Sequence, residues 1–376
     1  MSYRYANAIV KPGLNTLVAP PPVSYTYELW SWGANPSGQL GLGNTTNRSS
    51  PNQVGSLSDW LILSAGYNQS AAVKTDGTLW TWGNNASGQL GLGNTTYYSS
   101  PKQVGALTNW SKVKTSYQAT FAIKTDGTLW AWGGGNNGQL GLGNTSNYSS
   151  PKQVGALTNW LNIASGQYQC IAVKTDGTLW AWGNGTVGRL GLGNTTSYSS
   201  PKQVGALTIW ASSSCGSNWS MAATTTGQLY AWGANPYGQL GLGNTTYYSS
   251  PKQIGALTTW SKIGSGIRHS LAIKTDGTLW SWGYNANGEL GLNISIYTYK
   301  SSPTQVGALT TWSSVSGGFQ TSAAIKTDGT LWTWGRNSSG QLGTGNTTTQ
   351  SSPVQVGALT NWALVSTGNQ TLALSY

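Results

Sequence analysis

Short stretches of small, β-branched and aromatic residues alternate along the chain with longer glycine-rich polar stretches, at a period of roughly fifty residues. The clearest marker is Trp-x-Trp-Gly, with Tyr once in first place; its copies begin at Trp30, Trp80, Trp130, Trp180, Tyr230, Trp280 and Trp332. A second marker is a lone tryptophan that keeps the same step, at Trp60, Trp110, Trp160, Trp210, Trp260, Trp312 and Trp362. Nothing shows the 3.6-residue spacing of a helix, so the repeat predicts strands rather than a helical solenoid.

One unit of the repeat, residues 60–109, predicts four short strands. We expect them at 61–64, 70–74 and 78–82, with an outer strand at 103–104. Asp76 and Gly77 are typical of a two-residue hairpin turn, because glycine tolerates a positive φ. Pro101 suits the start of an edge strand, where no backbone N–H is needed.

A four-stranded unit cannot bury both of its faces alone, whereas radial stacking of about four to eight such units closes a β-propeller. Six complete units run from residue 60 to 361, and 362–376 contains only the first half of another. We therefore expect this half to combine with roughly 25–59 in a seventh blade, which removes the open edges of the array. The predicted fold is an all-β, seven-bladed propeller over 25–376, with four-stranded blades, preceded by an extended arm over 1–24.

The composition indicates a neutral surface that forms hydrogen bonds. Only 7% of residues are charged, against about 25% in an ordinary soluble domain. The formal net charge of +11 invites a nucleic-acid interpretation, but the lysines recur with the repeat and form no run, so nucleic-acid binding is not expected. No stretch of eighteen apolar residues predicts a membrane span, and no secretory signal is visible. Cys170 and Cys215 are expected to be free thiols rather than a disulfide or a metal pair.

The unit resembles the repeat of the regulator of chromosome condensation family. Its Asn-x-x-Gly-Gln-Leu-Gly tail occurs in copies that begin at Asn35, Asn85, Asn235 and Asn337, and 266–270 contains the Gly-x-x-His-Ser of that family. The resemblance covers about residue 25 to 376 and implies a seven-bladed propeller that binds or scaffolds other proteins. It does not extend to nucleotide exchange on a GTPase, the activity of the founding member. The blades are close copies, and the one insertion, within 293–300, adds only two residues.

Candidates for catalysis are scarce. Five of the eight acidic residues are the turn Asp of Lys-Thr-Asp-Gly or its equivalent: Asp76, Asp126, Asp176, Asp276 and Asp328. The one histidine, His269, stands where other units have Gln69, Gln169, Gln320 and Gln370, so we expect a hydrogen-bonding role rather than catalysis. No Cys/His cluster has metal spacing, and the glycines do not open helices as phosphate loops do. We expect a non-enzymatic protein with no catalytic residue, cofactor or metal.

Two features could bind a partner. The first is a rim of loops that bear tyrosines, namely Tyr98, Tyr148, Tyr198 and Tyr248, which could engage glycans, a host surface or another protein. The alternative is that these side chains cover the gaps between neighbouring blades. The second is the arm, whose Ile9, Val10, Pro12 and Leu14 could dock on a partner subunit. The alternative there is a disordered tail.

Three functional hypotheses follow from these features. The leading one is an accessory bacteriophage virion protein, on a capsid or tail, that displays a propeller anchored by its arm. Near-identical repeats, scarce charge and the lack of an export signal all suit it. The alternative is a cytoplasmic or cell-surface interaction scaffold of the kind that the resemblance implies. The weakest is a guanine nucleotide exchange factor.

Overall fold

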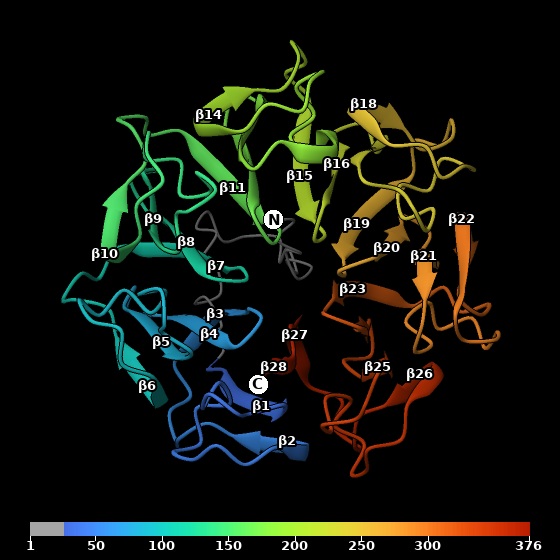
Figure 1. The fold of residues 1–376 in the computed structure, drawn as a ribbon. Helices are drawn as coiled ribbons and strands as arrows, with labels where there is room; N and C mark the ends of the chain where they lie inside the picture. The colour runs from blue at the N-terminus through green and yellow to red at the C-terminus, as the bar shows by residue number, and fades with distance from the viewer. Residues whose placement is uncertain (1–25) are drawn as a thin grey trace, which may run out of the picture.

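The computed structural model describes residues 26–376 as seven four-stranded antiparallel sheets arranged radially around one axis (Figure 1). This confirms the predicted all-β propeller and its number of blades. The expected arm, with Ile9, Val10, Pro12 and Leu14, lies outside the described residues.

Each blade has strands in the same order from the axis outward. The innermost strands are β3 (Trp60–Ala65), β7 (Trp110–Thr115), β11 (Trp160–Ser165), β15 (Trp210–Cys215), β19 (Trp260–Ser265), β23 (Trp312–Gly317) and β27 (Trp362–Thr367). The second strands are β4 (Gln69–Lys74), β8 (Ala119–Lys124), β12 (Gln169–Lys174), β16 (Trp219–Thr224), β20 (His269–Lys274), β24 (Thr321–Lys326) and β28 (Gln370–Ser375).

The outer half of each blade follows the Trp-x-Trp-Gly motif. The third strands are β5 (Leu79–Gly83), β9 (Leu129–Gly133), β13 (Leu179–Gly183), β17 (Leu229–Gly233), β21 (Leu279–Asn285), β25 (Leu331–Gly335) and β1 (Glu28–Gly33). The outermost strands are β6 (Tyr98–Gln103), β10 (Tyr148–Gln153), β14 (Tyr198–Gln203), β18 (Tyr248–Gln253), β22 (Thr298–Gln305), β26 (Gln350–Gln355) and β2 (Arg48–Gln53). A short 3-10 helix, η1 (Thr186–Gly188), lies in one of the loops between them.

The last blade combines both ends of the described chain. Its strand order is β2-β1-β28-β27, and β1 pairs with β28 without a break from Glu28 opposite Ser375 to Gly33 opposite Gln370. The predicted closure is confirmed. This pairing joins both ends of the described chain in one four-stranded blade, so that the β1 and β28 edges are not left unpaired.

The outermost strand differs from its prediction. It spans Tyr98–Gln103 instead of 103–104, and Pro101 lies inside it rather than at its start. The register between β5 and β6 shifts between Thr81 and Gly83, which marks a bulge. Because β6 is an edge strand with a bulge, the missing N–H of Pro101 is tolerated there.

Large side chains fill the space between neighbouring blades. Trp182 of β13 is fully buried, and its indole N–H donates to the carbonyl oxygen of Gln139 in the blade before (2.8 Å). The ring of Trp160 meets those of Trp180 and Trp182 at centroid distances of 6.2 and 5.9 Å. Lys174 lies 3.8 Å from the Trp180 centroid, a cation–π contact that closes the stack.

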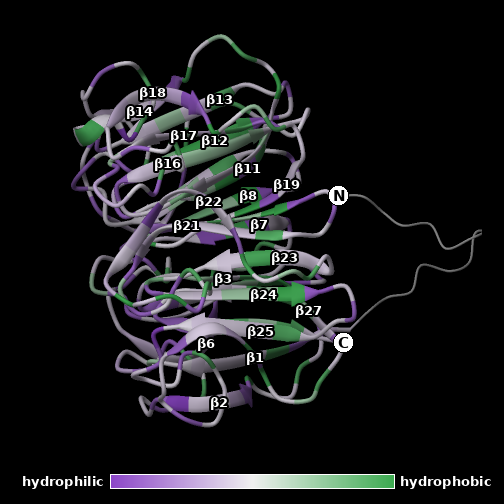
Figure 2. Cartoon of the chain, turned by 90° about the vertical axis from the view of Figure 1, so that its right-hand side faces the viewer, coloured by the Kyte–Doolittle hydropathy of each residue, from purple (hydrophilic) through white to green (hydrophobic). Residues whose placement is uncertain are grey.

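The two flat faces of the disc carry different connections, because every blade is antiparallel (Figure 2). On one face, which we call the hairpin face, lie the turns between second and third strands and the Gly-Ala-Leu-Thr links to the next blade. The other, the long-loop face, carries the short loops between first and second strands and the long loops, such as 84–97, between third and outermost strands. The C-terminus lies at the hairpin face, where the rings of Tyr27 and Tyr376 meet with centroids 6.3 Å apart.

Candidate functional site

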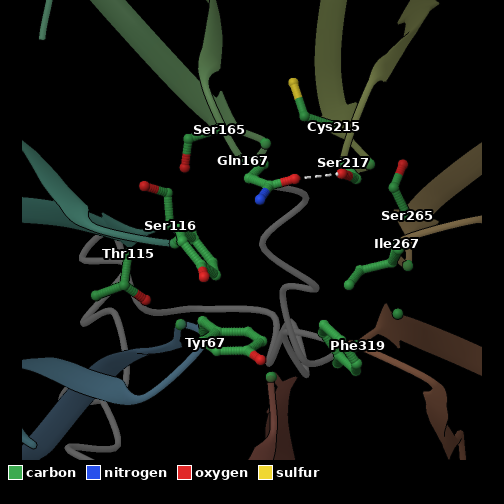
Figure 3. A pocket seen from close by; sticks show the side chains of 18 of the residues that line it. Tyr67, Thr115, Ser116, Ser165, Gln167, Cys215, Ser217, Ser265, Ile267 and Phe319 are labelled. Atoms are coloured by element: carbon green, nitrogen blue, oxygen red, sulfur yellow. Dashed lines mark hydrogen bonds between the residues drawn. The ribbon is translucent and has the colours of Figure 1, made fainter. Parts of the chain in front are cut away.

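A recess of about 160 Å³ opens at the centre of the disc (Figure 3). Every blade contributes residues from the short loop between its first and second strands. We call these loops the mouth loops; they comprise 66–68, 116–118, 166–168, 216–218, 266–268, 318–320 and 368–369. All seven blades can therefore contact a single ligand in the central recess.

The mouth loops differ from blade to blade, unlike the long loops. The outer motif Gly-Leu-Gly-Asn-Thr is the same at 41–45, 91–95, 141–145, 191–195 and 241–245. In contrast, the middle positions of six mouth loops hold six residues of five types: Tyr67, Tyr117, Gln167, Ser217, Ile267 and Phe319. A ring of identical loops would present the same groups in every direction, whereas these loops give the recess distinct sides.

One side of the recess is aromatic. The rings of Tyr67 and Tyr117 have centroids 4.7 Å apart, and Tyr67 meets Phe319 edge to face at 5.1 Å (Figure 3). The ring of Tyr168 extends the group, 6.1 Å from that of Tyr117. Aromatic side chains bring a large contact area with little loss of conformational entropy, which suits a binding surface.

Backbone hydrogen bonds join the mouth loops to one another. The N–H of Tyr67 donates to the carbonyl oxygen of Ser116 (3.2 Å), and that of Phe319 to Gly368 (3.1 Å). The loops approach closely: a Cβ on Gly368 would lie 1.9 Å from the carbonyl oxygen of Gly66. These hydrogen bonds connect the mouth loops and so fix the positions of the side chains that line the recess.

The other side of the recess is polar. The hydroxyl of Ser217 donates to the side-chain oxygen of Gln167 in the neighbouring blade (2.7 Å). Lys114 and Cys215 also line the recess. Burial lowers the pKa of Lys114 and raises that of the Cys215 thiol to about 12. Cys170 is buried and its pKa is raised as well, so both cysteines are the free thiols expected from the sequence.

The sequence comparison decides the family. The model of the RCC1-like domain matches residues 28–374. The chain belongs to the RCC1-like domain family. This confirms the resemblance found in the repeat.

Solved structures share the fold of this RCC1-like chain. Prp20p from Saccharomyces cerevisiae, described with its binding properties to Gsp1p and histones, is 21% identical at a TM-score of 0.83, over 94% of this chain and 92% of that one. The same yeast protein bound to Kap60 also gives 21% and 0.83, over 94% and 89%. Human WBSCR16 is 20% identical at 0.83, over 93% and 98%. These identities establish the fold alone, and no curated protein matches the chain.

A second hollow, of about 120 Å³, lies beside the recess, where the blade of β19–β22 meets that of β23–β26. These are the fifth and sixth blades when the blade of β3–β6 is counted as the first. His269 is buried there, and its Nε2 lies 2.9 Å from the hydroxyl of Ser322, which donates to the carbonyl oxygen of Glu289. Burial lowers the pKa of His269 to about 4 and raises that of Glu289. The hydrogen-bonding role expected for His269 is confirmed.

The predicted equivalence of His269 and Gln320 is wrong. Thr321 pairs with Gly335 just as His269 pairs with Gly283, so Gln320 lies one position earlier. The mouth loops 266–268 and 318–320 have the same length, so Gln320 corresponds to Arg268 and Thr321 takes the position of His269.

The rim tyrosines expected to bind a partner are the first residues of β6, β10, β14 and β18. Tyr148 is typical of them: its hydroxyl accepts from the Asn144 amide (3.1 Å), and Lys152 lies 5.8 Å from its ring centroid. The ring packs against the apolar cluster between the second and third blades. These contacts fit the alternative, that the tyrosines cover gaps between blades, while a binding role stays a prediction.

The central recess was not predicted, although the sequence contains a signal for it. Aligning the repeats position by position separates the invariant outer motif from the mouth loops that differ. The insertion at 293–300, which the sequence shows as two added residues, lengthens β21 and β22 and leaves Tyr297 73% exposed. Within residues 26–376, no helix is long and apolar enough to cross a membrane, and no group of three His, Cys, Asp or Glu side chains could hold a metal.

Proposed function

We propose that this RCC1-like chain is a non-enzymatic interaction scaffold whose protein partner docks on the long-loop face and places a side chain in the central recess. One observation carries the proposal. In a chain of near-identical repeats, the mouth loops differ from blade to blade, and they bring Tyr67, Tyr117 and Phe319 together at the axis. Buried aromatic anchors of this kind supply much of the affinity in protein interfaces.

This proposal prefers the scaffold hypothesis to the virion hypothesis. The family is one of propellers, and the yeast structures carry titles about the binding of Prp20p to Gsp1p, histones and Kap60. Nothing in the comparisons points to a capsid or a tail. A cytoplasmic location accompanies the scaffold proposal, and the rim tyrosines and the arm over 1–24 remain secondary candidate contacts.

Nucleotide exchange on a GTPase stays the weaker alternative. The long loops are near copies of one another, and the insertion at 293–300 lengthens one hairpin without adding a separate element. An assay of nucleotide release that stays flat when the full chain is added removes this alternative.

The proposal is tested by affinity capture with the tagged full chain as bait. We compare the wild type, the double variant Tyr67→Ala/Phe319→Ala, and Leu107→Ala, which truncates a 47% exposed side chain on the hairpin face. A partner that is captured by the wild type and Leu107→Ala, but about tenfold less by the double variant, supports docking at the recess. Equal capture by all three, with the fold of each confirmed by circular dichroism, refutes it.

A further inference from the structure

Glu289 places a carboxylate where five other blades have a glutamine. The equivalent residues are Gln39, Gln89, Gln139, Gln239 and Gln341, and the remaining blade has Arg189. The other acidic residues of the described chain, Glu28, Asp59 and the five turn Asp, lie at the hairpin-face ends of their blades. Glu289 is therefore the one acidic side chain among residues 26–376 on the long-loop side of the propeller.

The exchange of glutamine for glutamate removes a hydrogen bond between blades. In the blade of β1 and β2, the side-chain amide of Gln39 donates to the Oδ1 of Asn68 in the next mouth loop (3.3 Å). Glu289 has no N–H in its side chain when ionised, and Gln320, the residue equivalent to Asn68, has its side-chain oxygen held by Arg336 (2.9 Å). Both Glu289 and Gln320 line the hollow of about 120 Å³. The hollow thus lies where that hydrogen bond would otherwise join the two blades.

No cation neutralises this buried carboxylate. It accepts from the backbone N–H of Asn287 (2.7 Å) and from the side-chain amide of the same residue (3.2 Å), which leaves its oxygens free to accept about two further hydrogen bonds. Between residues 26 and 376, the only ion pair is that of Lys74 with Asp59. Burial of a carboxylate without a counter-charge costs free energy, and the raised pKa of Glu289 reflects that cost.

Two arginines lie beside the hollow, but each is held by other contacts. The guanidinium of Arg268 lies over the stacked rings of Tyr237 and Tyr284, 5.3 and 6.0 Å from their centroids. The guanidinium of Arg336 is held by two hydrogen bonds of 2.9 Å. The carboxylate of Glu289 is therefore available to a cation from outside the chain.

The walls of the hollow suit an ammonium group. Tyr284 and Phe319 line it, and aromatic rings attract cations. A compact ammonium group with three donors fits a small hollow with one carboxylate better than the broad, planar fork of a guanidinium does. Ile267 and Phe319 line both the hollow and the central recess, so the two spaces adjoin.

From these contacts we infer that the hollow receives the ammonium group of a lysine side chain of the docked partner, bound by the carboxylate of Glu289 beside the rings of Tyr284 and Phe319. The inference deepens the proposed function, on which it rests for the source of the lysine. The net charge of +11 repels cations from a distance, so recognition depends on contacts inside the hollow. A free amine offers the same chemistry, and the experiment separates the two sources.

His269 serves as the reporter for the test, because it lines the hollow and is the only histidine of the sequence. NMR of the full chain with ¹³C-labelled histidine follows its ring at pH 8, where lysine is protonated. The probes are N-acetyl-lysine amide for a lysine side chain, methylammonium for a free amine, and N-acetylnorleucine amide as the uncharged control. We expect a saturable shift of the His269 signals with N-acetyl-lysine amide and none with the norleucine analogue. A response to methylammonium alone supports the ammonium site but overturns a lysine side chain as its ligand.

Variants complete the test. Glu289→Gln, which restores the residue of the other blades, should weaken probe binding by about tenfold or more. Asp276→Asn, which removes a carboxylate at the hairpin face of the same blade, should leave it unchanged. No saturable shift with either amine, or equal binding by Glu289→Gln, overturns the inference when the fold is intact by circular dichroism. If capture of the partner is still lost in Tyr67→Ala/Phe319→Ala in that case, only the ammonium site fails. If that double variant captures the partner as well as the wild type, the proposed function fails too.

Discussion

Tyr67 and Phe319 meet edge to face with ring centroids 5.1 Å apart, although their blades are separated by the one that joins the two chain ends. The mouth loop of that last blade is one residue shorter than that of the first: the N–H of Gly368 donates to Gln370 (2.7 Å), whereas that of Gly66 donates to Gln69 (2.9 Å). The aromatic side of the recess therefore depends on the closure of the propeller.

Burial of His269 predicts a loss of stability in mild acid. Its pKa is about 4 in the folded chain and about 6.5 when unfolded, so between these values only the unfolded chain takes up the proton. The free energy of unfolding should fall by an amount on the order of 3 kcal/mol as pH drops from 6.5 to 4. Urea denaturation across this range measures it.

The matched variant for this prediction is His269→Gln, since Gln occupies the equivalent position at Gln69 and Gln169. The variant should lose the fall in stability between pH 6.5 and 4, whereas Glu289, whose pKa is raised by burial, acts in the opposite direction in both proteins. The turn carboxylates such as Asp276, whose pKa is lowered by hydrogen bonds from Thr278, affect stability only at lower pH. An unchanged slope in the variant would show that another group titrates.

Glu289 is a departure from the repeat that should cost stability. It is 2% exposed, and burial raises its pKa. Its carboxylate accepts from the N–H of Asn287 (2.7 Å), just as the side-chain oxygen of Gln139 accepts from that of Asn137 (2.8 Å). Glu289→Gln should raise the free energy of unfolding by about 1 kcal/mol at pH 8 and by less at pH 4, where the carboxyl is protonated. A destabilised variant at pH 8 would mean that the buried charge has a partner or a role.

Much of the fold was predictable from sequence because the tryptophans of each Trp-x-Trp-Gly copy pack between blades in the same way. Trp182 fills the space beside the preceding blade, and the spacing of the motif therefore counts the blades directly. Strand ends were less predictable. Pro101 suggested the start of a strand, yet the bulge between Thr81 and Gly83 lets the edge strand continue through it.

The candidate site was harder to predict because it depends on what the repeats do not share. Tyr67 and Phe319 occupy equivalent loop positions, but they belong to blades far apart in the sequence, which meet only when the propeller closes. Lys114 carries no motif, and only the structure shows that it lines the recess without a partner. The repeated positions predict the propeller fold, whereas we expect function at the positions where the repeats differ.

Closure can be tested by moving the chain ends. Because Tyr27 and Tyr376 are in contact, a short linker between residues 376 and 26, with new ends in the exposed link at 105–106, should give a folded permutant with a melting temperature near that of the wild type. Deletion of 362–376 removes β27 and β28 and exposes an unpaired edge of β1, so this variant should aggregate. Differential scanning calorimetry and size-exclusion chromatography compare them; a monomeric, cooperative deletion variant would contradict the account of closure.

The hydrogen bond from Trp182 to Gln139 joins two blades. We expect it to stabilise the fold more than the hydrogen bond from Trp180 to Thr178, which lies within one blade. Trp182→Phe leaves the buried carbonyl oxygen of Gln139 with only the weak thiol donor of Cys170 (3.4 Å), and should lower the free energy of unfolding by about 2 kcal/mol. Trp180→Phe is the control, since that indole donates within its own turn, to Thr178 (2.9 Å), and is partly exposed. It should cost less than half as much in guanidinium denaturation. Equal costs would refute the importance of the bond between blades.

Site-specific photo-cross-linking tests the central claim, that the partner docks at the recess of the long-loop face. Benzoylphenylalanine is placed at Tyr67, in the recess, or at Leu107, on the hairpin face, and each full-length protein is irradiated with the captured partner. The account predicts a covalent adduct from position 67 and none from position 107. An adduct from position 107 alone, or equal yields from both, would contradict it.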